Sequence, residues 1–207
     1  MTIYKDYNCM VNKTYRIIFN LIIPIALGII SSVITFITQS EMFYLFFFMM
    51  VILTVDADYF GIGCICKNDS FGMEYVKTSF RGKKVIKHTF LLDICFGIVR
   101  NLLFFLASLI YMIDRYSNIS IMVISFLLIN IIYILSLNIT RYFDSFLLIQ
   151  FIAMIFEALF IASALVLYIL NLGKWGTLVL LCGLLLASFM VTYFHMILKL
   201  KASYKDN

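Results

Sequence analysis

The charged residues that could take part in chemistry lie within long apolar stretches of the sequence. Arg100 and Glu157 each lie near the middle of such a stretch, and Asp93 precedes Arg100 by two helical turns. A charge at the centre of a bilayer costs about 2.5–3.5 kcal/mol on insertion scales, so it normally faces a protein interior or water and has a partner. We therefore predict that Arg100 and Glu157 pair across helices. Asp93 shares the Arg100 face, roughly 10 Å nearer one membrane surface.

Further polar residues extend this set. Asp56 and Asp58 point to different faces at the end of a second apolar stretch, so at most one of them joins Asp93 or Arg100. Asn130, and also Asn138 and Gln150, carry amides that can hydrogen-bond between helices. We expect a clamp that fixes helix packing, with direct substrate contact as the alternative. The intramembrane polar residues are Asp56, Asp58, Asp93, Arg100, Asn130 and Glu157.

His88 and Cys95 have the residue types of a base and a nucleophile. Their seven-residue spacing places them on one helical face, as a membrane cysteine peptidase would require. Two helical turns nevertheless separate them by about 10 Å, so the peptidase is an alternative hypothesis. Cys64 and Cys66 could form half of a metal site, but no His or second Cys pair lies near them, and we assign no metal. The odd count of five cysteines predicts free thiols.

The composition indicates the elements that must position these residues. Of 207 residues, 64% are hydrophobic and 13% are charged, whereas soluble proteins have about 25% charged residues. This excludes soluble, disordered, disulfide-rich and nucleic-acid-binding classes. A spanning helix needs about 20 apolar residues. Stretches of that length predict an all-α, polytopic protein with six transmembrane helices, at about 17–37, 42–61, 89–113, 119–139, 143–170 and 175–198.

Lys and Arg residues gather at the two ends of the chain and in the loop between the second and third stretches. Cytoplasmic loops carry such an excess, so we predict a plasma-membrane protein with both termini cytoplasmic. The chain reads as one transmembrane domain, 1–207, with an interfacial amphipathic helix at 1–16 and a cytoplasmic tail at 199–207. Pro24, the single proline, predicts a bend or hinge in the first span.

The loop at 62–88 is long and basic enough to have structure of its own. Ser70 could cap a short amphipathic helix with Met73, Val76 and Phe80 on one face, and Gly82 could end it before Lys83 starts a second. Such a helix fits a groove on another protein. The alternative is a polybasic loop that binds anionic lipid headgroups.

The run YVKTSFRGKKVI, from Tyr75 to Ile86, follows two predicted helices and precedes four more. With this run in this position, the chain resembles the small permease subunits of ABC-2 type transporters. The resemblance implies that Phe71 to Lys87 contains a coupling helix for a separate ATPase subunit. It also implies two permease copies or paralogues working with an ATPase dimer by alternating access. The implied coupling residues are Phe71, Met73, Tyr75, Val76, Phe80, Arg81, Lys83 and Lys84.

The phosphate-binding motif G-x-x-x-x-G-K-[ST] does not occur in this sequence. We therefore expect ATP and Mg²⁺ to bind to the partner ATPase, and we expect no cofactor in this chain. We therefore predict a permease subunit, itself not an enzyme, that exports a peptide or another amphipathic or apolar compound. The alternatives are the His88/Cys95 peptidase and an immunity or sensor subunit that does not transport. Membrane lipid is an expected partner, and nucleic acid is not.

Overall fold

The computed structural model describes residues 6, 13–38, 43–61, 79–109, 119–140 and 173–203, together with the helical positions 147–148, 151, 154–155, 158–159 and 162. Every secondary-structure element in this described part is helical, which confirms the all-α class. The elements are α2 (Lys13–Ile17), the π-helix η1 (Ile18–Ile22), α3 (Ile23–Thr38), α4 (Phe43–Gly61), α6 (Gly82–Leu109), α7 (Ile119–Thr140) and α9 (Gly173–Ser203).

Three helices are long and apolar enough to cross a membrane. They cover Lys13–Thr38, Gly82–Leu109 and Trp175–Lys199, with 26, 28 and 25 residues. At about 1.5 Å per residue, each exceeds the roughly 30 Å of bilayer hydrocarbon. Large apolar side chains also cover the outside: Phe36 is 60% exposed and Val179 is 73% exposed. Lipid is the solvent that this surface suits.

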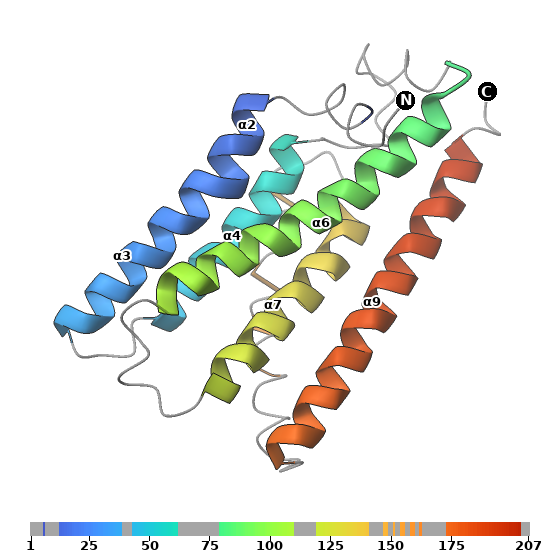
Figure 1. Ribbon diagram of the computed structural model, residues 1–207. Coiled ribbons are helices and arrows are strands. Elements are labelled where there is room, and N and C mark those ends of the chain that lie inside the picture. The colour runs from blue at the N-terminus through green and yellow to red at the C-terminus, as the bar shows by residue number, and fades with distance from the viewer. Residues whose placement is uncertain are drawn as a thin grey trace.

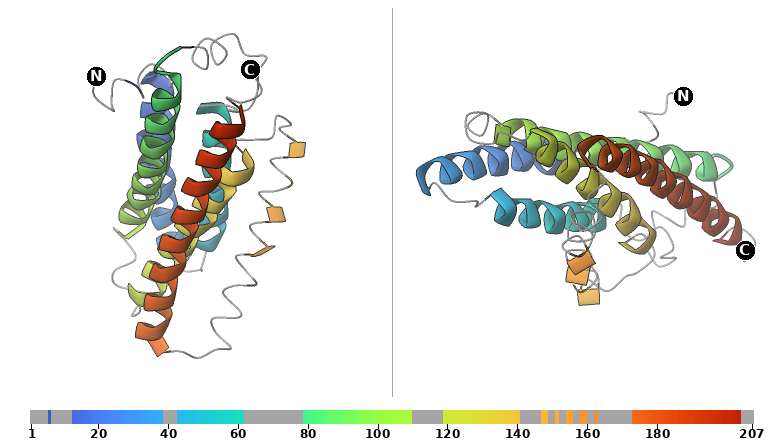
Figure 2. Two further views of the ribbon diagram at one scale, coloured as in Figure 1. Left: turned by 90° about the vertical axis from the view of Figure 1, so that its right-hand side faces the viewer. Right: turned by 90° about the horizontal axis from the view of Figure 1, so that it is seen from below.

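The helices run beside one another in a bundle (Figure 1). The starts of α2 and α6 and the ends of α4, α7 and α9 lie at one end (Figure 1). We call it the basic end, because it carries Lys13, Arg16, Arg81, Lys83, Lys84, Lys87 and Lys199. Figure 2 shows α3 and α6 side by side; α6 also packs on α7, α7 on α9, and α4 on both α3 and α7.

Small residues allow α3 and α6 to approach closely. A Cβ atom added at Gly28 would lie 2.6 Å from the Ala107 Cβ and 2.7 Å from the Phe104 carbonyl oxygen. Ser31 and Ser32 are buried on the same face of α3. Lipid provides no hydrophobic drive for helix association, so close backbone packing of this kind has to hold the helices together.

Two apolar clusters fill the bundle. The larger one joins α4, α6, α7 and α9 and is rich in phenylalanine, with Phe47 and Phe104 fully buried. Edge-to-face contacts link Phe105 to Phe47 and Phe126. The smaller cluster packs Ile86, Phe90 and Ile94 of α6 against α7 and α9.

Two helix starts differ from the expectations. The first span begins at Lys13, so Lys13 to Arg16 belong to it and not to a separate interfacial helix. Likewise α6 begins at Gly82, after a turn in which the Gly82 N–H donates to the Ser79 carbonyl (2.9 Å). Nothing between Gly82 and Thr89 breaks a helix, since Lys and Ile are adequate helix formers. A separate second loop helix starting at Lys83 is therefore wrong.

Candidate functional site: a buried polar cluster around Arg100

Arg100 is enclosed at the centre of the bundle, only 2% exposed. Its Nη1 donates to the Asn20 Oδ1 of η1 at 3.2 Å, and its Nη2 to the Thr54 carbonyl of α4 at 3.5 Å. The guanidinium carbon also lies 5.4 Å from the centroid of the Tyr133 ring of α7. Arg100 therefore contacts three helices besides its own, through hydrogen bonds and a cation–π contact.

A chain of amides and a hydroxyl continues from this arginine. The Thr54 hydroxyl lies 3.3 Å from the Asn101 Oδ1, and the Asn101 Nδ2 donates to the Asn130 Oδ1 at 3.1 Å. The Asn130 Nδ2 donates in turn to the Phe126 carbonyl at 2.8 Å. Thr54, Asn101 and Asn130 are at most 1% exposed. The Arg100 cluster is defined as Asn20, Thr54, Arg100, Asn101, Asn130 and Tyr133.

The π-helix places Asn20 in this cluster. Pro24 has no N–H to donate, and its ring would clash with the carbonyl four residues earlier, which belongs to Asn20. The chain widens into η1 instead, and the Ile23 N–H bonds to the Ile18 carbonyl five residues back. π-turns of this kind are frequent at functional sites. Pro24, expected as a hinge, is buried at the start of α3, directly after η1.

Gly97 makes room for Tyr133. A Cβ added at Gly97 would overlap the Tyr133 ring, so only glycine permits the ring to lie on the α6 backbone. The Tyr133 hydroxyl donates to the Asp93 carbonyl at 3.0 Å, which fixes the ring one turn from Arg100. Sequence reasoning missed Gly97 and Tyr133. The available signal was a glycine one turn before an intramembrane arginine.

The structure brings together only some of the polar residues expected in the membrane. Arg100 and Asn130 lie in one cluster, and Asp93 is half-buried with its backbone in contact with Tyr133. Glu157 and the side chains of Asp56 and Asp58 lie outside the described residues. The pairing of Arg100 with Glu157 stays a prediction.

The turn before α6 is the described part of the expected coupling segment. Phe80 is fully exposed, at 105% of its reference area. Arg81, Lys83 and Lys84 are exposed beside it at the basic end. Phe71, Met73, Tyr75 and Val76 lie outside the described residues.

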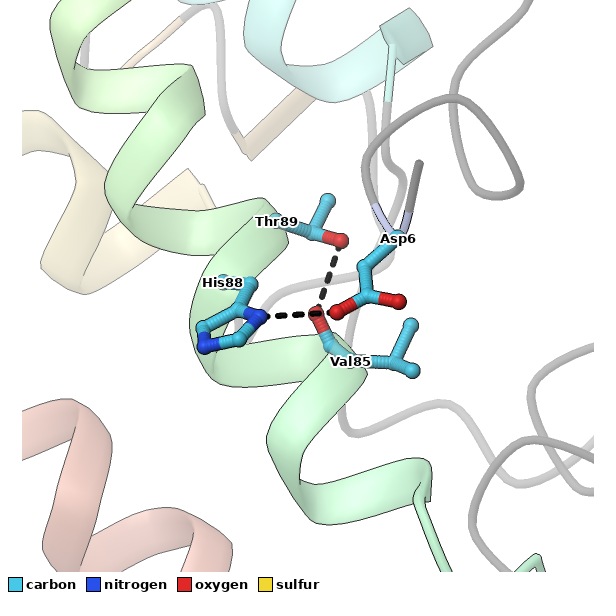
Figure 3. A network of polar contacts seen from close by, with 4 residues as sticks. All are labelled: Asp6, Val85, His88 and Thr89. Carbon is cyan, nitrogen blue, oxygen red and sulfur yellow. Dashed lines mark hydrogen bonds and ion pairs between the residues drawn. The ribbon is translucent and has the colours of Figure 1, made fainter. Parts of the chain in front are cut away.

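His88 contacts an acidic residue near the start of the chain. Its Nδ1 lies 2.7 Å from the Asp6 Oδ2, and Asp6 is 5% exposed (Figure 3). Thr89 donates within the helix to the Val85 carbonyl (Figure 3). Cys95 is a free, exposed cysteine farther along the same continuous helix. Among the described contacts, none joins His88 to Cys95.

Among the described residues, amide and carbonyl oxygens and an aromatic ring surround the buried Arg100 cation. In the described residues, His, Cys, Asp and Glu do not gather in groups of three or more that could hold a metal. The fold and this cluster define an all-helical membrane protein with a polar centre. Comparison with models of known families, with curated proteins and with solved structures gives no match for this chain.

Proposed function

We propose that the protein is the membrane-spanning permease subunit of an ABC-2 type transporter, coupled to a separate ATPase subunit and exporting a peptide or another amphipathic or apolar compound. The observation that carries the proposal is Phe80. A fully exposed phenylalanine stands in a turn flanked by Arg81, Lys83 and Lys84, at the basic end of the bundle. ATP and Mg²⁺ belong to the ATPase in this proposal.

An aromatic side chain in such a turn fits a pocket on a partner protein. Buried aromatic and arginine anchors provide most of the binding energy at protein interfaces. The turn is also anchored to the spanning helix, because the Lys84 and Val85 N–H groups both donate to the Arg81 carbonyl at 3.0 Å. Movement of a partner at Phe80 is therefore transmitted to α6, the helix that carries Arg100.

The proposed topology has six spans with the basic end in the cytoplasm. α7 ends at the basic end and α9 begins at the opposite end (Figure 1), so the chain has to cross once between them. In that stretch the described large apolar side chains, among them Leu147, Phe151 and Met154, are 38–81% exposed and recur at helical spacing. This supports a fifth, lipid-facing span. The accumulation of Lys and Arg at one end supports the orientation.

The Arg100 cluster supports an alternating-access role. It joins the helix that contains η1 to α4, α6 and α7 through directional polar contacts in a low-dielectric setting. Packed helix interfaces are bistable and do not deform continuously, so a change between two arrangements would have to exchange these polar contacts together. In this proposal the cluster holds one of the two arrangements.

Co-purification tests the coupling. The tagged protein is co-expressed with neighbouring ATPase reading frames, extracted in mild detergent and assayed for a bound ATPase. Phe80→Asp is expected to reduce ATPase recovery more than tenfold, because it places a charge in an apolar pocket, while membrane insertion is unchanged. Phe80→Tyr, the matched control, keeps the aromatic ring and should retain the partner. Equal recovery with Phe80→Asp would refute the coupling role.

The cysteine peptidase is the second candidate, because the His88–Asp6 contact resembles the orientation of a catalytic histidine by a carboxylate. Against it, α6 is continuous from His88 to Cys95, which keeps the two side chains about 10 Å apart along the axis. In the transporter, Cys95→Ala leaves ATPase association and export intact. Loss of function in Cys95→Ala would favour the peptidase instead.

A further inference from the structure

A groove of about 530 Å³ lies between the first long helix and α6. Its walls change from basic to apolar along the bundle axis. Lys13 and Arg16 line its basic end, with Phe96 of α6 at about the depth of Arg16. Asn20 lies in the middle, and Leu21 and Leu103 continue the groove beyond it. The volume falls within the range of ordinary small-molecule sites, about 300–1,000 Å³.

The lining residues recur at the spacing of single helix faces. Lys13, Arg16 and Asn20 lie on one helix at steps of three and four, and Phe96, Val99 and Leu103 lie on α6 at the same steps. The groove is therefore an elongated channel parallel to the two helices. Ile17, Leu21 and Val99 are 45–49% exposed, so its long side opens outward to the lipid.

The length of the groove matches one leaflet. The Arg100–Asn20 hydrogen bond aligns the two helices in depth. Lys13 lies about 10 Å from Asn20 towards the basic end, and Leu103 about 5 Å beyond Arg100 in the other direction. The resulting span of roughly 15 Å is half of the bilayer hydrocarbon thickness.

We propose that this groove binds one anionic phospholipid, with its phosphate at Lys13 and Arg16 and one acyl chain along Leu21, Phe96 and Leu103. Lys13 and Arg16 make the described lining of the groove basic at this end, which favours a negatively charged headgroup. Basic pockets between helices on the cytoplasmic side are suited to anionic headgroups. The apolar length below the charges requires an acyl chain and not a free anion.

The site also has a route to the centre of the bundle. Asn20 both lines the groove and accepts the hydrogen bond from Arg100. A lipid in the groove thus contacts the residue that η1 presents to the Arg100 cluster. Lipid occupancy stabilises the arrangement in which Asn20 faces α6. The proposal does not depend on the ATPase coupling.

Lipid retention tests the site. The full chain in dodecyl maltoside is mixed with equal amounts of phosphatidylglycerol and phosphatidylcholine of identical acyl chains, and bound lipid is counted by native mass spectrometry. The wild type is expected to retain phosphatidylglycerol about tenfold over phosphatidylcholine. Lys13→Gln should lower that retention about fivefold, as expected for one basic residue near an anionic headgroup. Equal retention of the two lipids would overturn the proposal.

Two controls separate the site from general charge. Lys84→Gln removes the same charge at the basic end but outside the groove, and it should leave retention unchanged; an equal loss would overturn the proposal. Val99→Trp keeps both charges and fills the apolar part, so it should also reduce retention severalfold. If Val99→Trp retains the lipid fully, the acyl-chain assignment is wrong.

A competition arm distinguishes a lipid from a free phosphate. Inorganic phosphate at millimolar concentration should not displace phosphatidylglycerol; displacement would identify a site for soluble anions and overturn the lipid proposal. ATPase co-purification with Lys13→Gln and Val99→Trp is read in parallel. If these variants lose the lipid but still co-purify with the ATPase, the lipid site is supported independently of the coupling proposal. The two proposals can therefore fail separately.

Discussion

Arg100 shows at the residue scale how a buried charge is accommodated in this bundle. Its insertion cost of about 2.5–3.5 kcal/mol is set against hydrogen bonds that average about 0.6 kcal/mol each within membranes. The contact with Tyr133 adds a cation–π term of about 2 kcal/mol when desolvated. These described contacts offset much of the insertion cost, and because they are directional they also set the register of the helices.

Gly97 is the residue on which this arrangement depends most directly. Gly97→Ala is expected to destabilise the protein by about 1–3 kcal/mol, because the new methyl group overlaps the Tyr133 ring. The measurement is the thermal unfolding midpoint in detergent. Tyr133→Leu in the Gly97→Ala background should recover part of the loss by vacating that space.

Gly183 provides the matched control for this substitution. It lies in the exposed part of α9, and a Cβ added there would meet no atom within 4 Å. Gly183→Ala should stabilise the protein by about 0.5–1 kcal/mol, because alanine has the higher helix propensity. The unfolding midpoint should therefore rise slightly. If both substitutions have the same effect, close packing at Gly97 is not what constrains the site.

At the scale of elements, the π-helix η1 sets the direction of the first span. A π-turn holds one residue more than an α-turn, so removing it rotates the segment before it by about 100°. The groove residues Lys13 and Arg16 and the cluster residue Asn20 all lie before or within that turn. Pro24 thus positions both the Arg100 cluster and the groove.

Pro24→Ala tests this relationship. With an N–H restored at position 24, the helix can close on the Asn20 carbonyl, and Asn20 should turn away from Arg100. Asn20→Leu is expected to cost about 1 kcal/mol in the wild type and almost nothing in the Pro24→Ala background. Thermal unfolding of the four proteins gives both values. Asn130→Leu, on α7, should cost the same in both backgrounds; an equal cost for Asn20→Leu would contradict the role of Pro24.

At the scale of the whole molecule, charge is separated along the bundle axis. The described Lys and Arg side chains other than Arg100 lie in the terminal turns at the basic end. Lys87 also reaches across from α6 to α9, with its Nζ 5.3 Å from the Tyr193 ring centroid. Such an end suits the cytoplasmic surface, where anionic lipids attract basic segments.

Cysteine labelling tests the orientation. In a cysteine-free variant, a single Lys84→Cys should react with a membrane-impermeant maleimide only after the cells are permeabilised. Gly173→Cys, at the opposite end of α9, should react in intact cells. The physical reason is the retention of Lys and Arg on the cytoplasmic side during insertion. The reverse pattern would invert the topology and place Phe80 outside the cell.

The sequence alone was sufficient for the all-helical class and for the approximate positions of the apolar helices that the structure describes. Apolar length and the cost of exposing backbone polar groups to lipid act locally, so they can be recognised in one stretch at a time. The stretches at 42–61 and 119–139 correspond closely to α4 and α7. The start of α6 was misplaced because basic residues suggested a loop, whereas helix propensity and continuity extended the helix to Gly82.

Tertiary structure alone decided the partners of the polar residues. The sequence indicated that Arg100 needs a partner but not that Asn20, Thr54 and Tyr133 surround it, because those contacts join positions 33 to 80 residues apart. Helix rotation at η1 and the absence of a side chain at Gly97 determine which groups meet. The groove between the first helix and α6 has the same origin, since it exists only where two distant helix faces come together.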